Sequence, residues 1–367
     1  MSSEYERSGV DYGRLDLIKR LAVAAAAKTD DLAVNNDGFD VFGSTRGEPA
    51  FCFTVGTQTL ALVVEGLGTK SLIAERVLSE TGENYFDAVA KDAVAAIVND
   101  LLCVGALPLV VNAYWSVGDA TWYDSEAAEA LINGWQLACR ESGAVWGGGE
   151  SPALPDIVAK GAIELAGSAV GAIPQGKRPM TGEAIAEGDR IILVESSGMH
   201  TNGASAMRRL AGDLPDGYNT SIDSAGTTFG RAILVPTVNY TPLVRRLVED
   251  SDCEISYINH ITGHGFLKLM RPVGEWRYVI EQLPPVPPLF EFFVRERSLD
   301  AAEAYTLFNM GAGLALYVRP RSVTGVLDAA AAVGLNAWDA GRVEPGTRSV
   351  AIEPHDVVFD ADAMRLR

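Results

Sequence analysis

The 367-residue chain carries 30 Lys and Arg against 48 Asp and Glu, which gives a formal charge of −18. This acidic balance argues against nucleic acid or an anionic membrane surface as a partner, because both bind to clustered cationic faces. An anionic substrate would need backbone donors or a metal ion to bind in such a field. The composition, 48% hydrophobic and 21% charged, is typical of a folded globular protein, and the length predicts two domains.

The sequence shows no pattern of a membrane helix or a secretory signal. The longest apolar runs, such as residues 93–98 and 105–111, are far shorter than the roughly 20 residues that a membrane helix needs. The first fifteen residues carry acids and lack an apolar core. Four scattered cysteines show no CxxC spacing: Cys52, Cys103, Cys139 and Cys253. We therefore expect reduced core thiols and a cytoplasmic protein.

Strand and helix signals alternate in the first half. Residues 50–64 predict two short strands around a turn at Gly56. The segment 84–104 predicts a helix, because it is rich in Ala, lacks Gly and Pro, and is apolar at helical spacing. The elements expected next are a strand after Pro108, a helix over 125–141, a glycine loop at 147–149 and a strand pair over 158–173.

Residues 174–189, which are rich in Pro, Gly and charge, predict a linker between an N-terminal domain (1–174) and a C-terminal domain (188–367). Beyond the linker we expect a strand at 190–195, a helix over 204–212, a stiff connection at 283–290, and a helix followed by a strand over 328–346. The mixture of helices with antiparallel-looking strand pairs favours an α+β fold.

The segment EGLGTK, Glu65–Lys70, follows a predicted strand and has the composition of a phosphate-binding loop. Gly66 and Gly68 would let backbone N–H groups approach a phosphate, while Thr69 adds a hydroxyl and Lys70 a cation. An acid directly before such a loop suggests a metal ion that bridges the acid and the phosphate. The spacing is too short for a Walker loop, and a plain turn is the alternative.

Two acids lie on the predicted helix 84–104. Asp92 and Asp100 are eight residues apart, so their carboxylates face roughly one side of the helix, about 12 Å apart along its axis. Asn99 and Asp100 interrupt an apolar run, where a buried charge is costly without a partner or a metal ion. Asp92 could equally be a solvated helix residue, and both a functional and a structural role fit Asp100.

Polar, glycine-rich loops carry the other candidates. In GGGESPALP (147–155), Glu150 could supply an oxygen ligand to a metal ion, and a flexible turn is the alternative. In SSGMHTNG (196–203), a loop that opens a helix suits an anion and places His200 among donors, although a structural histidine also fits. HITGHGF (260–266) and FNMGAG (308–313) are similar clusters that carry little weight alone.

These six segments, in this order, resemble the AIR synthetase (phosphoribosylformylglycinamidine cyclo-ligase) family over about residues 5–345. The family motifs DGVGTK, GGET, SSGPHSNG, HLTGGGF and FNxGxG correspond to EGLGTK, GGES, SSGMHTNG, HITGHGF and FNMGAG. The start YERSGVD (5–11) is also similar to that of the family. This start and the SSGMHTNG and FNMGAG pair favour this family over thiamine-monophosphate kinase and selenophosphate synthetase in the same superfamily.

The resemblance implies a two-domain α+β chain whose N-terminal half forms a β-barrel across a homodimer, while the C-terminal half closes the cleft. It implies ATP- and Mg²⁺-dependent closure of formylglycinamidine ribonucleotide to 5-aminoimidazole ribonucleotide, with release of ADP and phosphate. A diverged paralogue that activates another acceptor with ATP is one alternative. A non-catalytic nucleotide-binding dimer is the other.

The resemblance and the residue types together give a candidate site. The catalytic candidates are His200, Lys70 and Asp100. The residues expected to bind ATP are Gly66, Gly68, Thr69, Lys70, Asn99, Gly148 and Gly149. Those expected to bind the substrate are Ser197, Asn202, Thr262, Gly263 and His264. The expected metal ligands are Glu65, Asp92, Asp100 and Glu150.

Two positions depart from the family pattern. Glu65 stands where the family has Asp, which adds a methylene to an expected metal ligand. His264 stands where the family has Gly, which places an imidazole where backbone would approach the substrate. If the enzyme is a paralogue, His264 is the position at which we expect specificity to have changed.

Overall fold

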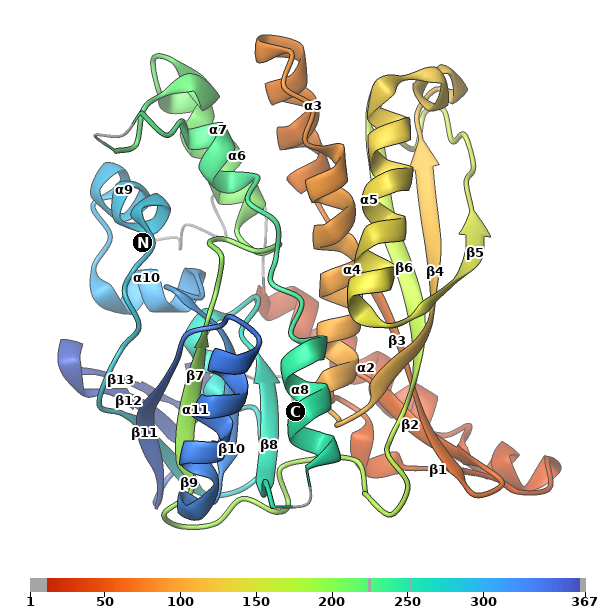
Figure 1. Ribbon diagram of the computed structural model, residues 1–367, viewed down its shortest axis with the longest axis vertical. Coiled ribbons are helices and arrows are strands. Elements are labelled where there is room, and N and C mark those ends of the chain that lie inside the picture. The colour runs from red at the N-terminus through yellow and green to blue at the C-terminus, as the bar shows by residue number, and fades with distance from the viewer. Residues whose placement is uncertain (1–11, 224–225, 251, 364–367) are drawn as a thin grey trace.

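Two β-sheets, one from each half of the chain, organise the structure, a computed structural model that describes residues 12–223, 226–250 and 252–363 (Figure 1). Helix α2 (Tyr12–Ala27) opens this part of the chain, and the YERSGVD segment lies outside the described residues. The fold is α+β, as expected. No helix in these three ranges has the length and apolarity needed to cross a membrane.

The N-terminal sheet has six strands in the order β1-β2-β3-β6-β4-β5. Their bounds are β1 (Phe39–Val41), β2 (Phe51–Val55), β3 (Gln58–Gly66), β4 (Leu107–Val117), β5 (Val145–Glu150) and β6 (Ile163–Ala172). The predicted hairpin around Gly56 is confirmed as β2 and β3. Strands β4 and β5 pair in parallel because helix α5 (Glu126–Ser142) connects them. The strand pair predicted over 158–173 is wrong, since only β6 forms there.

Helix α4 (Phe86–Leu102), which confirms the helix predicted over 84–104, lies between the two halves. Figure 1 shows α3 (Lys70–Thr81), α4 and α5 on the side of the N-terminal sheet that faces the C-terminal half. Strand β3 alternates accordingly, with Ala61 and Val63 buried and Leu62 and Val64 exposed. One face of this sheet therefore packs on helices, and its other face presents apolar side chains to solvent.

The C-terminal sheet has seven strands in the order β13-β12-β9-β11-β7-β10-β8. Their bounds are β7 (Arg190–Glu195), β8 (Ile255–His260), β9 (Trp276–Ile280), β10 (Ala312–Val318), β11 (Ala337–Pro345), β12 (Ser349–Ile352) and β13 (Val357–Asp360). The accompanying helices are α6 (Ala204–Asp213), α7 (Phe229–Ile233), α8 (Thr241–Glu249), α9 (Pro288–Arg297), α10 (Ala301–Leu307) and α11 (Val323–Ala332). Strand β7, helix α6 and the tail elements α11 and β11 confirm the predictions for this half.

The two Pro-rich connections behave differently. Residues 174–189 contain no helix or strand and run between the two sheets. The segment 283–290 is extended only as far as Pro287, because α9 begins at Pro288. Proline suits the first helical position, where its missing N–H would have had no partner.

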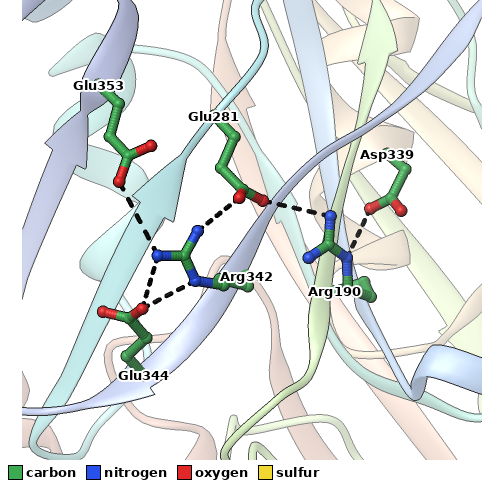
Figure 2. Close-up of polar contacts among 6 residues, drawn as sticks. All are labelled: Arg190, Glu281, Asp339, Arg342, Glu344 and Glu353. Carbon is green, nitrogen blue, oxygen red and sulfur yellow. Dashed lines mark hydrogen bonds and ion pairs between the residues drawn. The ribbon is translucent and has the colours of Figure 1, made fainter.

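An ion-pair network joins strands of the C-terminal sheet (Figure 2). Arg190 Nε lies 2.8 Å from Asp339 Oδ1, and Glu281 lies within ion-pair distance of both Arg190 (3.3 Å) and Arg342 (2.5 Å). Arg342 also contacts Glu344 at 2.7 Å. Such partly exposed pairs contribute on the order of 1 kcal/mol or less each, so the network supports the register of β7 and β11 rather than the core.

Candidate active site

A cavity of about 510 Å³ lies where the two halves of the chain meet. Glu65 enters it from the end of β3 and Asp100 from the last turn of α4. Asn202 comes from the loop before α6, and Thr262 and His264 come from the loop after β8. Four of the six sequence motifs therefore contribute side chains to one site. These residues span positions 65 to 264 of the chain.

Glu65 and Asp100 form a carboxylate pair in this cavity. Burial, together with the charge of Asp100, raises the pKa of Glu65 to about 8. Burial also acts to raise the pKa of Asp100, but the hydrogen bond with His260 and the charges of Lys268 and Arg271 outweigh it, so this pKa is lowered. At neutral pH the pair therefore holds one proton and one negative charge.

His260, at the end of β8, completes this group. Its Nδ1 lies 2.9 Å from Asp100 Oδ1, and its side chain is almost fully buried. Its Nε2 has no hydrogen-bond partner among the described residues. A buried ring nitrogen without a partner is costly, so this atom is suited to meet a bound ligand. His260 begins the HITGHGF motif, but it is not among the site residues predicted from the sequence.

The carboxylate pair fits a magnesium site in which the protein supplies only two of the ligands. Mg²⁺ usually keeps several waters and binds one or two carboxylates together with substrate phosphates. Throughout the described ranges, no group of three or more His, Cys, Asp or Glu side chains is placed to hold a metal ion. The predicted quartet is thus not brought together, because Asp92 and Glu150 lie elsewhere.

Asp92 forms a buried ion pair with Lys70. Lys70 Nζ lies 2.7 Å from Asp92 Oδ2, and neither side chain is exposed. The same ammonium donates to the carbonyl oxygens of His200 (2.8 Å) and Val235 (3.2 Å). Thr237 donates its N–H (2.9 Å) and its hydroxyl (2.5 Å) to Asp92 Oδ1. In this geometry Lys70 and Asp92 join α3 and α4 to the C-terminal half. The phosphate contact of Lys70 and the metal contact of Asp92 stay predictions.

Asn99 has a similar structural role. It is fully buried, its Oδ1 accepts from the Tyr240 N–H (3.0 Å), and its Nδ2 donates to the Val238 carbonyl (2.9 Å). Both ends of the amide are used within the chain, and the contact with ATP stays a prediction. Asn99 satisfies backbone groups of the segment that leads into α8.

The glycine run before Glu150 is part of strand β5 rather than the predicted loop. A Cβ on Gly149 would lie 2.0 Å from the Ala113 carbonyl oxygen, so the close approach of β4 requires glycine there. Gly148, at φ +108°, and Glu150 are exposed on this edge strand and do not line the 510 Å³ cavity. Within the chain, none of the three residues joins the other candidates.

The phosphate-loop candidates open onto two cavities. Glu65, Gly66 and Leu67 line the 510 Å³ cavity, whereas Gly68 and Thr69 line a second one of about 410 Å³. Gly68 has φ +73°, a conformation that glycine adopts readily, and Thr69 Oγ1 lies 3.2 Å from Ser205 Oγ. The loop is therefore placed to contact ligands in both spaces.

His200 lies behind the cavity rather than in its wall. The Ser197 N–H donates to His200 Nε2 (3.3 Å), and Nδ1 has no hydrogen-bond partner among the described residues. Burial, and then the charges of His260 and Lys70, lower the pKa of His200 well below its usual value, so the ring is neutral. Its centroid lies 6.4 Å from that of His260. Ser197, predicted to bind the substrate, donates its hydroxyl to the Pro236 carbonyl at 2.5 Å.

His264, which stands where the family has glycine, has a backbone conformation that glycine adopts more readily. Its φ is +71°, a left-handed conformation that favours glycine. The side chain lines the cavity, and its Nε2 lies 3.7 Å from Asp16 Oδ1 on α2, which is outside hydrogen-bond range. Burial, together with the charges of Lys268, Lys19 and Arg271, lowers the pKa of His264 to about 3. The imidazole is therefore neutral.

Replacing His264 by Gly is expected to leave the melting temperature unchanged or slightly higher. The change relieves about 1 kcal/mol of left-handed strain, and the contact with Asp16 that it removes is longer than a hydrogen bond. His264→Ala is the matched control, because it removes the ring but keeps the strain, and it is expected to be the less stable of the two by thermal unfolding. A His264→Gly protein that melts below His264→Ala would contradict this account.

Two family models match the chain: AIR synthase related protein, N-terminal domain, over residues 47–173, and AIR synthase related protein, C-terminal domain, over residues 186–353. The solved structure of AaThiL complexed with AMPPCP and TMP shares the fold, with a TM-score of 0.60 and 16% identity over 95% of this chain and 94% of that chain. Fold and site thus define an AIR-synthase-related protein with both domains.

Curated relatives give a narrower assignment. A phosphoribosylformylglycinamidine cyclo-ligase of Methanocaldococcus jannaschii is 32% identical over 340 residues, 92% of this chain and 91% of the relative. One of Lachnospira eligens is 30% identical over 356 residues, 95% of this chain and 99% of the relative. The chain belongs to the phosphoribosylformylglycinamidine cyclo-ligase (AIR synthase) family of purine biosynthesis, and it is an enzyme of that type.

Proposed function

We propose that the 510 Å³ cavity is the site at which ATP drives ring closure of formylglycinamidine ribonucleotide to 5-aminoimidazole ribonucleotide, with ADP and phosphate as the other products. The observation that carries the proposal is the Glu65–Asp100–His260 group, which joins the end of β3, α4 and β8 in one buried cluster. Family membership supplies the reaction class.

Glu65 and Asp100 are the residues that would hold Mg²⁺, whose positive charge would stabilise the negative charge that develops during phosphoryl transfer. His260, oriented by Asp100 through Nδ1, directs its Nε2 toward a ligand and can hold or move a proton there. Thr262 and Asn202, in the same wall, supply hydroxyl and amide groups that orient the substrate.

The nucleotide phosphates are proposed to contact the loop from Gly66 to Thr69. This loop opens onto both cavities, and the related structure of AaThiL was solved with AMPPCP. ADP release measured over a panel of amide and amidine substrates tests the alternative of a paralogue. Tight nucleotide binding without ADP release on any substrate would instead support a non-catalytic nucleotide-binding dimer.

His200 is proposed to act at the substrate end of the site through its neighbour His260 and the loop that it shapes. His200→Ala is expected to lower kcat by at least roughly 10²-fold with little change in the KM for ATP. Steady-state kinetics with ATP and substrate varied separately make the comparison. An unaltered kcat together with a lower melting temperature would identify His200 as a purely structural residue.

The exposed apolar face of the N-terminal sheet supports a homodimer. Val64 on β3 is 70% exposed, Val145 on β5 is 67% exposed, and Leu62, Leu109 and Tyr114 add to the same sheet. Such a face on a soluble chain usually marks an interface. The expected barrel across two copies would cover it.

Light scattering is expected to give about twice the chain mass of 39.0 kDa at micromolar concentration. Val64→Asp is expected to shift the population toward monomer, because a charge would enter the proposed interface. Val358→Asp, on the exposed strand β13 of the other sheet, is the control and is expected to leave the mass unchanged. A wild-type monomer would refute the dimer.

A further inference from the structure

Two cations, Lys268 and Arg271, line the candidate active-site cavity of a chain whose formal charge is −18. Lys268 belongs to the short 3-10 helix η5 (Gly265–Met270), and Arg271 follows its end. Three residues make one turn of such a helix, so side chains three positions apart lie on the same side. The local structure therefore holds two positive charges next to each other.

Three carboxylates line the same cavity as this cation pair: Glu48, Glu65 and Asp100. Glu65 is mostly protonated at neutral pH, because its pKa is raised to about 8. The Nε of Arg271 lies 3.7 Å from Glu48 Oε2. This nitrogen makes no hydrogen bond within the described part of the chain. Glu48 is shared, because its Oε2 also accepts from the Tyr257 hydroxyl at 2.7 Å. Lys268 forms no ion pair with any residue that the structure describes. Two charged carboxylates, Glu48 and Asp100, thus share the cavity with three cations, Lys19, Lys268 and Arg271. The remaining positive charge is one that a bound anion would offset.

Hydrogen bonds from outside the cavity fix the backbone that carries the cation pair. Asn259 on β8 donates its amide N–H to the Lys268 carbonyl, and Arg348 Nε donates to the Met270 carbonyl at 2.8 Å. Arg271 is 9% exposed, and its Nη2 donates to the Gly47 carbonyl at 2.7 Å. The backbone that carries both cations and the Arg271 guanidinium are therefore fixed, and they lose little freedom when a ligand binds.

A phosphate monoester matches this arrangement. It carries close to two negative charges at neutral pH and three strong acceptor oxygens. A guanidinium offers directed N–H donors to such oxygens, and an ammonium offers a compact point charge. Lys19 of α2 lines the same cavity and adds a third cation.

We propose that Lys268 and Arg271 form the subsite that binds the phosphate monoester of the ribonucleotide substrate. The identity of that ribonucleotide rests on the proposed function, whereas the anion site rests on the cations themselves. In the sequence, this subsite corresponds to two cations three positions apart that closely follow the HITGHGF motif.

Calorimetric titration of the full-length protein with ribose 5-phosphate, without ATP, tests the subsite. Wild type is expected to bind this probe at millimolar concentration and not to bind ribose. Lys268→Met and Arg271→Met are each expected to weaken binding by at least roughly tenfold, the effect of losing a charge-assisted hydrogen bond. Lys268→Arg is expected to retain binding, which separates loss of charge from loss of folding.

Lys177→Met and Arg178→Met are matched controls, because these cations are exposed and line a different cavity. Both are expected to bind ribose 5-phosphate as wild type does. A parallel titration with AMPPCP separates the two sources of phosphate, and its affinity is expected to change little in Lys268→Met. A larger loss for AMPPCP than for ribose 5-phosphate would assign the cations to the nucleotide and overturn the proposal.

Failure of wild type to bind ribose 5-phosphate, or equal binding by wild type, Lys268→Met and Arg271→Met, would also overturn the subsite. These outcomes are independent of ring closure. Binding that depends on both cations in a protein that forms no aminoimidazole would leave the subsite standing and remove only the proposed reaction.

Discussion

Replacing Asp100 by asparagine is expected to lower ATP-dependent turnover by a factor on the order of 10²–10⁴, the range for loss of a group that acts in proton transfer. Asparagine keeps the size and one acceptor of the side chain, but it brings no negative charge to hold a cation with Glu65. The melting temperature without ligand is expected to stay nearly the same, because the change also removes the repulsion that raises the pKa of Glu65.

Asp87→Asn is the matched control for Asp100→Asn. Asp87 lies in the first turn of the same helix, α4, and is exposed. Its substitution is expected to leave turnover unchanged in a coupled assay for ADP. Normal ATP turnover by Asp100→Asn would show that the carboxylate pair is not part of the active site.

Lys70→Met is expected to have the largest effect on stability. The substitution leaves the Asp92 carboxylate buried without its cation, and breaking a buried ion pair from one side costs about 3–5 kcal/mol. It also removes the donors to the His200 and Val235 carbonyls. Chemical denaturation with several probes is expected to show a correspondingly lower free energy of unfolding.

Glu80→Gln provides the comparison for an exposed ion pair. Glu80 pairs with Arg76 one turn away on α3, where the arginine side chain is largely exposed, and such pairs contribute about 0.5 kcal/mol or less. If Lys70→Met were no more destabilising than Glu80→Gln, and turnover alone were lost, Lys70 would act on the phosphates as the sequence first suggested.

The order of the helices and strands, and part of the candidate site, could be predicted from patterns within single segments of the sequence. The helix 84–104 could be predicted because its apolar spacing is a property of the segment itself, and the same pattern predicted that Asn99 and Asp100 are buried. What the pattern could not show is the partner of each group. Asp92 meets Thr237, and Asp100 meets His260, across 145 and 160 positions of the chain.

The loop predicted at 147–149 is wrong for the same reason. The run Gly147–Gly149 has the composition of a loop, but the close approach of β4 makes it a strand. Lys70 has the position of a phosphate-binding lysine, but the fold places Asp92 and two carbonyls around its ammonium. In the glycine run, tertiary contacts outweigh the local preference for a loop. The phosphate contact of Lys70 stays a prediction.

Incubation of the protein with ATP, Mg²⁺ and formylglycinamidine ribonucleotide, followed by assay for the aminoimidazole, tests the central claim most directly. The expected result is 5-aminoimidazole ribonucleotide in equal amount to ADP and phosphate, with no product when the metal ion is chelated. Release of ADP with another acceptor, while formylglycinamidine ribonucleotide remains unchanged, would contradict the cyclo-ligase assignment.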